Sequence, residues 1–182
     1  DYRAQIRYLR AMAHERLGDR RSADKDFYTL IETPAENGKR NKWSFWKAKA
    51  GLDLANRLFD EGNYLVAAGL YQALLSQNRT LDTQIKIHQQ IALCHAELKN
   101  PGEELRGWQR IGELWKHQRG RVKDMEDGLA MLEKESEALP EEEKHDNDAR
   151  IKQLKEELDV SHATLTPEIR LIVHMADSRG RM

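Results

Sequence analysis

The sequence predicts an all-α protein, and two observations support this prediction. Strong helix formers (Ala, Leu, Glu, Arg, Lys and Gln) dominate the 182 residues, and only four prolines are present. Helix-forming segments also alternate with short turns, and three of these turns are followed by similarly spaced packing residues. With 39% hydrophobic residues, the chain can bury a sizeable core.

The three turns align on positions 18, 62 and 99. Gly18 is followed by Ala23 and Phe27, Gly62 by Ala67 and Tyr71, and Lys99 by Glu104 and Trp108, in each case five and nine residues later. A residue that tolerates the left-handed conformation ends the first helix, and a small residue lets the second helix cross it closely. We therefore expect three antiparallel helix pairs, with helices at 2–17, 21–32, 43–61, 64–77, 81–98 and 102–118.

This pattern resembles the tetratricopeptide repeat, whose unit of about 34 residues holds two helices. The second pair matches at Leu54, Ala55, Leu58, Gly62, Tyr64, Ala67 and Tyr71. The first pair matches at Ala11, Gly18, Ala23, Phe27 and Leu30, with Pro34 near the closing proline, and the third at Ile91, Ala92, Trp108 and Ile111. The resemblance covers about residues 4–117 and implies a right-handed superhelix of antiparallel helix pairs, an α-solenoid.

The chain also departs from the family. Arg10 stands where the family has an apolar residue, and the turns lie 44 and 37 residues apart. We expect the larger insertion, near residues 34–41, to be an exposed loop because it contains Pro34, Asn37 and Gly38. The array is therefore predicted to be a divergent, tetratricopeptide-like one.

Beyond Gly120 the sequence predicts further amphipathic helices. Their apolar positions are Met125, Leu129, Leu132, Leu139, Ile151, Leu154 and Leu158, and Pro140 precedes an acidic first turn. Thr166 as N-cap and Pro167 at the first position favour a helix over 166–176, although alternating apolar residues leave a strand open. We expect two domains, 1–120 and 121–182, with residues 121–158 folded back as capping helices. A free acidic tail or a coiled-coil arm is the alternative.

Charge and cysteine content narrow the function classes. The net charge of −1 argues against a nucleic-acid or membrane-surface protein, yet residues 1–50 carry a balance of +5 and residues 124–159 one of −9. No apolar run reaches the roughly 18 residues that cross a membrane. Cys94 is the only cysteine, which fits either the cytosol or a bacterial periplasm. The chain begins at Asp1, as a fragment or processed product would.

No catalytic, cofactor or metal motif appears. His88 and His95 lie seven residues apart, about 10 Å along a helix, which is too far to share one ion without other ligands. The segment 38–51 interleaves lysines with Trp43, Phe45 and Trp46. We expect these aromatics to anchor the following helix in the core; a groove for an acidic protein segment, and after it a nucleic-acid site, are the alternatives.

The resemblance implies a concave face, lined by the first helix of each pair, that binds a peptide or partner domain. The partner-binding residues implied in this way are Tyr8, Met12, Lys49, Asp53, Asn56, Phe59, Lys86, Gln89 and Gln90. Gln5, Tyr8 and Leu9 occupy the places where some family members carry a clamp for a chaperone's carboxylate, so that activity is not predicted. The predicted function is a non-enzymatic protein-interaction scaffold. A nucleic-acid-binding repeat or an accessory domain of a larger enzyme are the alternatives.

Overall fold

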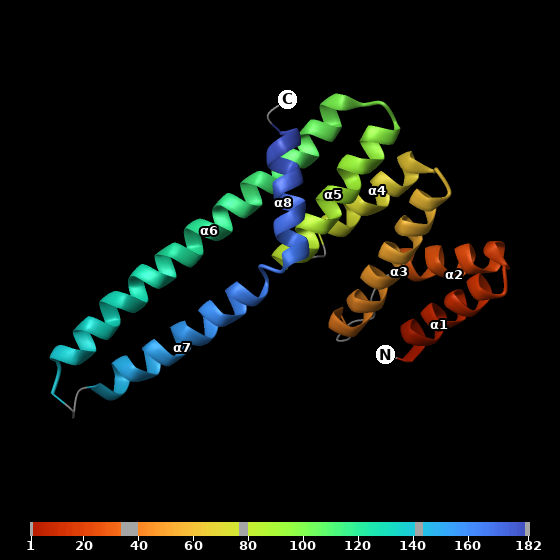
Figure 1. Ribbon diagram of the computed structural model, residues 1–182. Coiled ribbons are helices and arrows are strands. Elements are labelled where there is room, and N and C mark those ends of the chain that lie inside the picture. Colours follow the sequence, from red (N-terminus) through yellow and green to blue (C-terminus); the bar gives the residue numbers. More distant parts are fainter. Residues whose placement is uncertain (1, 34–39, 77–79, 141–143, 181–182) are drawn as a thin grey trace. The chain divides into compact units, whose positions relative to one another are not determined.

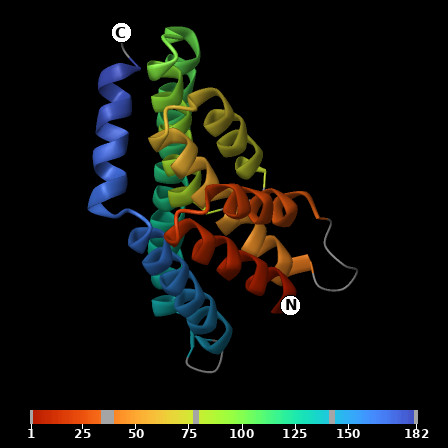
Figure 2. The same cartoon turned by 90° about the vertical axis from the view of Figure 1, so that its right-hand side faces the viewer.

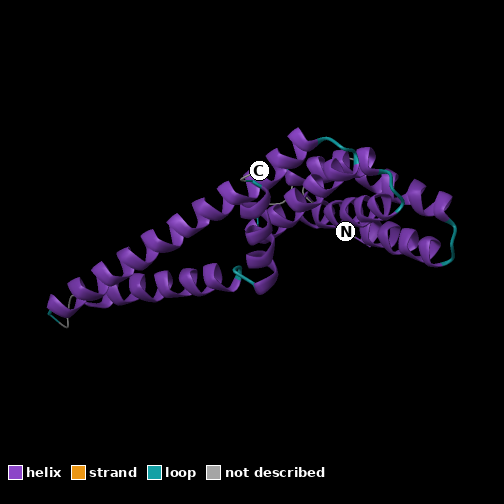
Figure 3. Ribbon diagram, turned by 45° about the horizontal axis from the view of Figure 1, so that its top comes forward, coloured by secondary structure: helices purple, strands orange, loops and turns teal. Residues whose placement is uncertain are grey.

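A computed structural model describes residues 2–33, 40–76, 80–140 and 144–180 of the chain (Figure 1). Within these ranges it contains eight α-helices and no strand, which confirms the all-α prediction (Figure 3). The helices are α1 (Tyr2–Arg16), α2 (Arg20–Glu32), α3 (Arg40–Asp60), α4 (Tyr64–Leu75), α5 (Leu81–Glu97), α6 (Pro101–Ala138), α7 (Lys144–Ala163) and α8 (Pro167–Arg179). They form two compact units, residues 1–107 and 108–182, and the boundary between them falls inside α6.

In the first unit each helix packs on the next one along the chain. Contacts join α1 to α2, α2 to α3, α3 to α4 and α4 to α5, and α1 also contacts α3. Within a pair, residues later in the first helix contact residues earlier in the second helix. In the second pair, for example, Asn56 contacts Tyr71 while Phe59 contacts Tyr64. The two helices of that pair are therefore antiparallel, as predicted.

The three aligned turns share one backbone structure. Gly18, Gly62 and Lys99 have φ angles of 76°, 79° and 56°. In each turn the next N–H donates to a carbonyl five residues earlier, at 2.9 Å (Asp19 to His14), 2.8 Å (Asn63 to Leu58) and 2.9 Å (Asn100 to His95). This is the Schellman ending of an α-helix, and it recurs even where lysine replaces glycine. The three turns inferred from sequence spacing are therefore confirmed.

Small residues lie at the helix crossings, although in the third pair the aligned position holds Glu104 in place of alanine. Ala23 and Ala67 are fully buried, as expected. In the third pair Glu104 is only half-buried, and the close approach occurs at Gly107. A Cβ atom on Gly107 would lie 2.8 Å from the Cβ of Ala92. The small residue of the third pair is thus glycine, nearly one helical turn later than the repeat pattern placed it.

Arg57 joins three helices of the first unit. Its side chain is only 13% exposed and forms ion pairs with Asp24 on α2 and with Glu15 on α1, the latter at 3.5 Å. Its guanidinium carbon also lies 5.7 Å from the ring centre of Phe27, a fully buried core residue. A buried cation needs such partners, because desolvation without them is costly.

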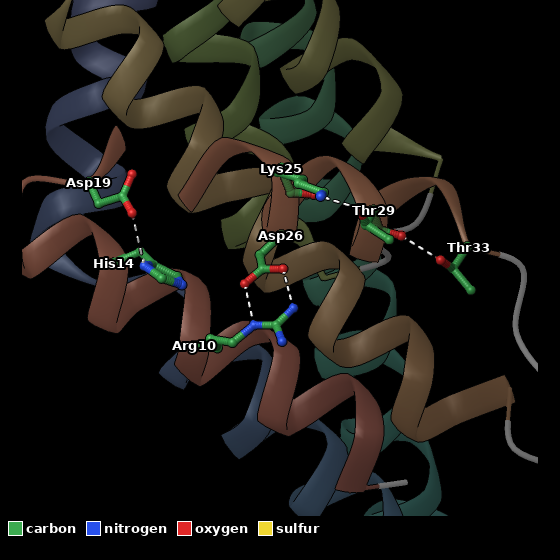
Figure 4. A network of polar contacts seen from close by, with 7 residues as sticks. All are labelled: Arg10, His14, Asp19, Lys25, Asp26, Thr29 and Thr33. Carbon is green, nitrogen blue, oxygen red and sulfur yellow. Dashed lines mark hydrogen bonds and ion pairs between the residues drawn. The ribbon is translucent and has the colours of Figure 1, made fainter. Parts of the chain in front are cut away.

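A second, partly buried ion pair links α1 to α2 (Figure 4). Asp26 is buried, and its carboxylate accepts hydrogen bonds from Nε of Arg10 at 2.6 Å and from Nη2 of Arg10 at 2.5 Å. The residue that departs from the family pattern at position 10 thus has a specific partner. These hydrogen bonds, and the positive charge of Arg10, hold the pKa of Asp26 below its usual value.

We expect Asp26→Asn to lower the free energy of unfolding at pH 7 by about 1 kcal/mol, because Arg10 is solvent-exposed and partly screened. The lowered pKa means that ionised Asp26 stabilises the fold above the unfolded-state pKa of about 4. That stabilisation is lost as the pH falls through the folded-state pKa. Urea unfolding at pH 7 and at acidic pH measures the difference, which should shrink in acid. The exposed control Asp124→Asn should show little difference at either pH. An Asp26→Asn effect that persists unchanged in acid would contradict this.

Helix α6 is longer than predicted. Its predicted end is residue 118, but the helix continues without interruption from Pro101 to Ala138. Gly112 and Gly120 lie inside it, and a glycine in a helix interior costs only about 1 kcal/mol. Buried Val122 continues the packed face beyond Gly120. The predicted helix end near residue 118 is therefore wrong, and residues 121–138 prolong α6.

Helix α7 turns back along the second half of α6 (Figure 2). The side-chain contacts are Ser136 to Asp148 at 3.2 Å, Glu133 to Lys155 at 2.7 Å and Glu126 to His162 at 3.5 Å. Residues later in α7 contact residues earlier in α6, so the two helices are antiparallel. The predicted start at Pro140 cannot be compared, because 141–143 lie outside the described residues. That residues 121–158 cap the third pair stays a prediction.

Helix α8 confirms the helical interpretation of residues 166–176. Thr166 is the N-cap, and its hydroxyl accepts the Ile169 N–H at 3.3 Å, with Pro167 opening the helix. The guanidinium carbon of Arg179 lies 5.2 Å from the ring centre of Trp108, so the end of α8 lies beside the first residues of the second unit. The predicted loop near residues 34–41 lies mostly outside the described residues, and α3 begins at Arg40.

Candidate functional site

The structure brings three predicted partner-binding residues together, at the contact between α1 and α3. The Tyr8 hydroxyl donates a hydrogen bond to Oδ2 of Asp53 at 2.6 Å. The Lys49 ammonium lies 5.3 Å from the centre of the Tyr8 ring. Tyr8 is buried, and this burial, with the bond to Asp53, raises the pKa of Tyr8. The three residues therefore hold two helices of the first unit together.

Two further predicted residues also make contacts inside the first unit. Asn56 accepts a hydrogen bond from the Tyr71 hydroxyl at 2.6 Å, and Phe59 packs edge-on against Tyr64 with ring centres 5.2 Å apart. Met12 is half-buried against the core of this unit. Lys86, Gln89 and Gln90 are half-buried on α5. Much of the predicted binding surface is thus engaged in packing.

The basic and aromatic segment divides into an anchored part and an exposed part. Trp46 is half-buried, with its ring centre 5.2 Å from that of Tyr8, and it packs against the core of the first unit. Phe45 lies edge-on against Trp46 and is 59% exposed. Nothing is described of the Trp43 side chain. Trp46 therefore anchors α3, as expected from the sequence.

The outward side of α1 is apolar, although the repeat pattern did not predict a binding surface there. Tyr2, Ile6 and Leu9 are 82%, 61% and 54% exposed, and Ala13 is exposed as well. We call these four residues the α1 apolar face. Their spacing of i, i+4, i+7 and i+11 places them along one line of the helix, opposite the buried Ala4, Tyr8 and Ala11. That spacing could have been recognised in the sequence, but the repeat pattern assigned Leu9 to another face.

Arginines border the α1 apolar face on both sides. Arg3 and Arg10 follow Tyr2 and Leu9 directly in the sequence, so they project from one edge of the stripe. Arg16 projects from the other edge. The face belongs to the part of the chain with a charge balance of +5 over residues 1–50. An apolar stripe with cationic borders attracts a surface that is apolar in its middle and acidic at its edges.

The described part of the chain contains no group of three or more His, Cys, Asp or Glu side chains placed to hold a metal ion. Cys94 is buried in the first unit, and burial raises the pKa of its thiol to about 11. At neutral pH the thiol therefore stays protonated, which makes it a poor nucleophile. It packs as a small core residue.

In the described ranges, each helix is too short or too polar to cross a lipid bilayer. No protein-family model matches the sequence, and no curated protein matches it significantly. The α1 apolar face and its arginine borders are therefore a candidate binding surface on geometric grounds alone.

Proposed function

We propose that this chain is a non-enzymatic protein-interaction module whose first unit is a divergent tetratricopeptide-like array. The proposal is supported above all by the three turns at Gly18, Gly62 and Lys99, which share one hydrogen-bond pattern. After each turn, the N–H of the fifth residue donates to the first carbonyl of the new helix segment, at 3.1, 3.0 and 3.1 Å. Repeated helix pairs of this kind offer extended surfaces to partners.

The partner is an amphipathic helix that docks on the α1 apolar face. From Tyr2 to Ala13 the stripe runs for eleven residues, about 16 Å, which matches roughly three turns of a second helix. Helices pack by laying the ridges of one into the grooves of the other, and a line of apolar side chains supports such packing. Exposed Ile6 and Leu9 at its centre supply the apolar area that becomes buried.

The partner helix carries acidic residues beside its apolar stripe. Among the arginines that border the α1 apolar face, Arg10 is already bound to Asp26, so Arg16 would meet those carboxylates at the rim of the contact. Charges at a rim chiefly steer association and select the partner, while the apolar centre supplies most of the affinity. Complex formation should therefore weaken with added salt.

The α1 apolar face is proposed as the binding site in preference to the predicted concave surface, for a structural reason. Tyr8 and Asp53 already bind each other, and Asn56 binds Tyr71. A peptide that used these groups would have to replace existing hydrogen bonds, which reduces the net gain on binding. That a peptide crosses α1, α3 and α5 stays a prediction.

Selection from a displayed library of designed amphipathic helices tests the proposal. We expect helices with acidic flanks to be enriched over matched helices with basic flanks. The double variant Ile6→Gln with Leu9→Gln should weaken binding of the selected helices by at least about tenfold, because it removes the apolar centre. The stability of this variant should change little, since both side chains are exposed in the free protein.

The matched control is Leu65→Gln with Val66→Gln, two exposed apolar residues on α4 of the same unit. Binding should survive this change. If the α1 and α4 double variants behave alike, or if acidic and basic flanks are enriched equally, the α1 apolar face is not the binding surface.

A further inference from the structure

A cavity of about 850 Å³ lies entirely within the second unit. Its walls come from the face of α6 between Gly112 and Glu126, from the end of α7 at His162, and from α8. The turn from α7 to α8 contributes Leu165, and α6 contributes Val122, so part of the wall is apolar. A volume of this size lies within the range of about 300–1,000 Å³ that is usual for small-molecule sites.

Four cationic side chains line this cavity. Lys116, Arg119 and Lys123 follow one another along one face of α6, and Arg170 joins them from α8. All four are exposed, and none of them forms an ion pair with any part of the chain that the structure describes. Elsewhere on α6, by contrast, Arg110 binds Glu113 at 2.8 Å. Four cations and two carboxylates line the cavity, so its lining is positive on balance.

Gln118 adds an amide group to the lining of the cavity. It lines the cavity and is only 8% exposed, yet within the described ranges its amide has no hydrogen-bond partner. Most of the Gln118 side chain is buried, but its amide atoms are not among the buried unpartnered polar atoms of the described ranges, so they reach the open space of the cavity. The Gln118 amide both donates and accepts, so it can bind a polar group of a molecule in the cavity.

Two carboxylates also line the cavity: Glu126 lies one helical turn beyond Lys123 on α6, and Asp177 lies on α8. Glu126 is held by His162 at 3.5 Å. Asp177 lies two residues before Arg179, whose guanidinium covers Trp108, so Asp177 belongs to the end of the cavity nearest Gly112. Because α8 is antiparallel to this part of α6, Arg170 lies about 10 Å further along, toward Arg119 and Lys123. One end therefore favours an anion, and the other can accept hydrogen bonds.

Trp115 lies on the α6 wall, one helical turn before Arg119, and is half-buried. Its indole ring is a surface on which a flat ring can stack. Arginine and lysine side chains bind phosphate oxygens strongly, arginine often through two hydrogen bonds. The cavity thus offers an anion site beside a ring site and a hydrogen-bond acceptor.

We propose that this cavity binds a phosphorylated small molecule with an aromatic ring, for which nucleotides are the simplest probes. The phosphates lie against Arg119, Lys123 and Arg170, and the ring lies against Trp115. Gln118 binds a polar group between them, and Asp177 accepts hydrogen bonds from ring substituents. This binding is independent of the partner helix proposed for the first unit.

Calorimetric titration of the full chain with ATP tests the proposal, with pyrophosphate, adenosine and citrate as comparisons. ATP should bind more tightly than each of the other three, because only ATP combines the ring with several phosphates. Arg119→Glu should weaken ATP binding by at least about tenfold, and Gln118→Leu by about three- to tenfold. Arg121→Glu is the matched control: it makes the same charge change on the same helix, but Arg121 does not line this cavity.

Circular dichroism spectra and thermal melts establish that each variant is folded. The proposal is overturned if ATP does not bind at millimolar concentration. It is also overturned if Arg119→Glu and Arg121→Glu weaken ATP binding equally, which would indicate a diffuse attraction to a basic surface. Citrate or pyrophosphate binding as tightly as ATP would remove the role assigned to Trp115.

Discussion

Replacing Ala67 with leucine is expected to lower the free energy of unfolding by about 2–3 kcal/mol. Ala67 lies on α4 and is fully buried within the core of the first unit, where α3 and α4 pack. A leucine adds three carbon atoms for which the neighbouring helices leave no room. Accommodating them forces strained side chains or a shift of the helices, and either response costs stability. Urea unfolding at pH 7 measures the change.

Ala73 provides the control for this substitution. It lies on the same helix, but it is exposed, so Ala73→Leu should change the free energy of unfolding by less than about 0.5 kcal/mol. The two variants add the same atoms and differ only in their surroundings. An Ala67→Leu protein as stable as the parent would mean that α3 and α4 do not approach closely at this residue.

Replacing Gly107 with alanine is expected to destabilise the protein by about 1–3 kcal/mol, even though alanine is the better helix former. The added Cβ would lie 2.8 Å from the Cβ of Ala92 and 3.2 Å from its Cα. Because the obstacle includes backbone, rotation of a side chain cannot relieve it. The close contact between these two helices would have to open.

Gly69 on α4 gives the opposite expectation. Nothing lies within 4 Å of a Cβ placed there, so Gly69→Ala should raise the free energy of unfolding by about 0.5–1 kcal/mol through helix propensity alone. Thermal melts of the two variants should therefore shift in opposite directions. A stabilised Gly107→Ala protein would contradict the close approach of Gly107 to Ala92.

Local signals in the sequence predicted most of the helices. The turns at Gly18, Gly62 and Lys99 followed from spacing, and the N-cap at Thr166 followed from the Thr-Pro pair. These features depend on a few neighbouring residues, so a single sequence contains them. The end predicted for α6 failed because a glycine such as Gly120 weakens a helix only slightly, and packing of the residues around it decides whether the helix continues.

The surfaces were harder to predict, because they depend on residues far apart in the chain. Arg10 departs from the repeat pattern, and the structure shows that its guanidinium binds Asp26, which lies sixteen residues later in the sequence. Tyr8 was expected to meet a partner, but its hydroxyl binds Asp53. The cavity joins Arg119 on α6 to Arg170 on α8, and no local pattern connects these two residues. The α1 apolar face could have been predicted, since its residues recur at helical spacing in the sequence.

The packing of each helix on its neighbour in the first unit has a kinetic consequence. Contacts between consecutive helices close only short loops, so little chain entropy is lost before each contact forms. Folding of this unit can begin at any of its hairpins and spread to the next. Opening can likewise proceed one helix pair at a time. Among the described helices of this unit, α1 packs on α2 and α3, whereas α3 packs on three helices, so the helix that exposes the apolar face has fewer neighbours to hold it during local opening.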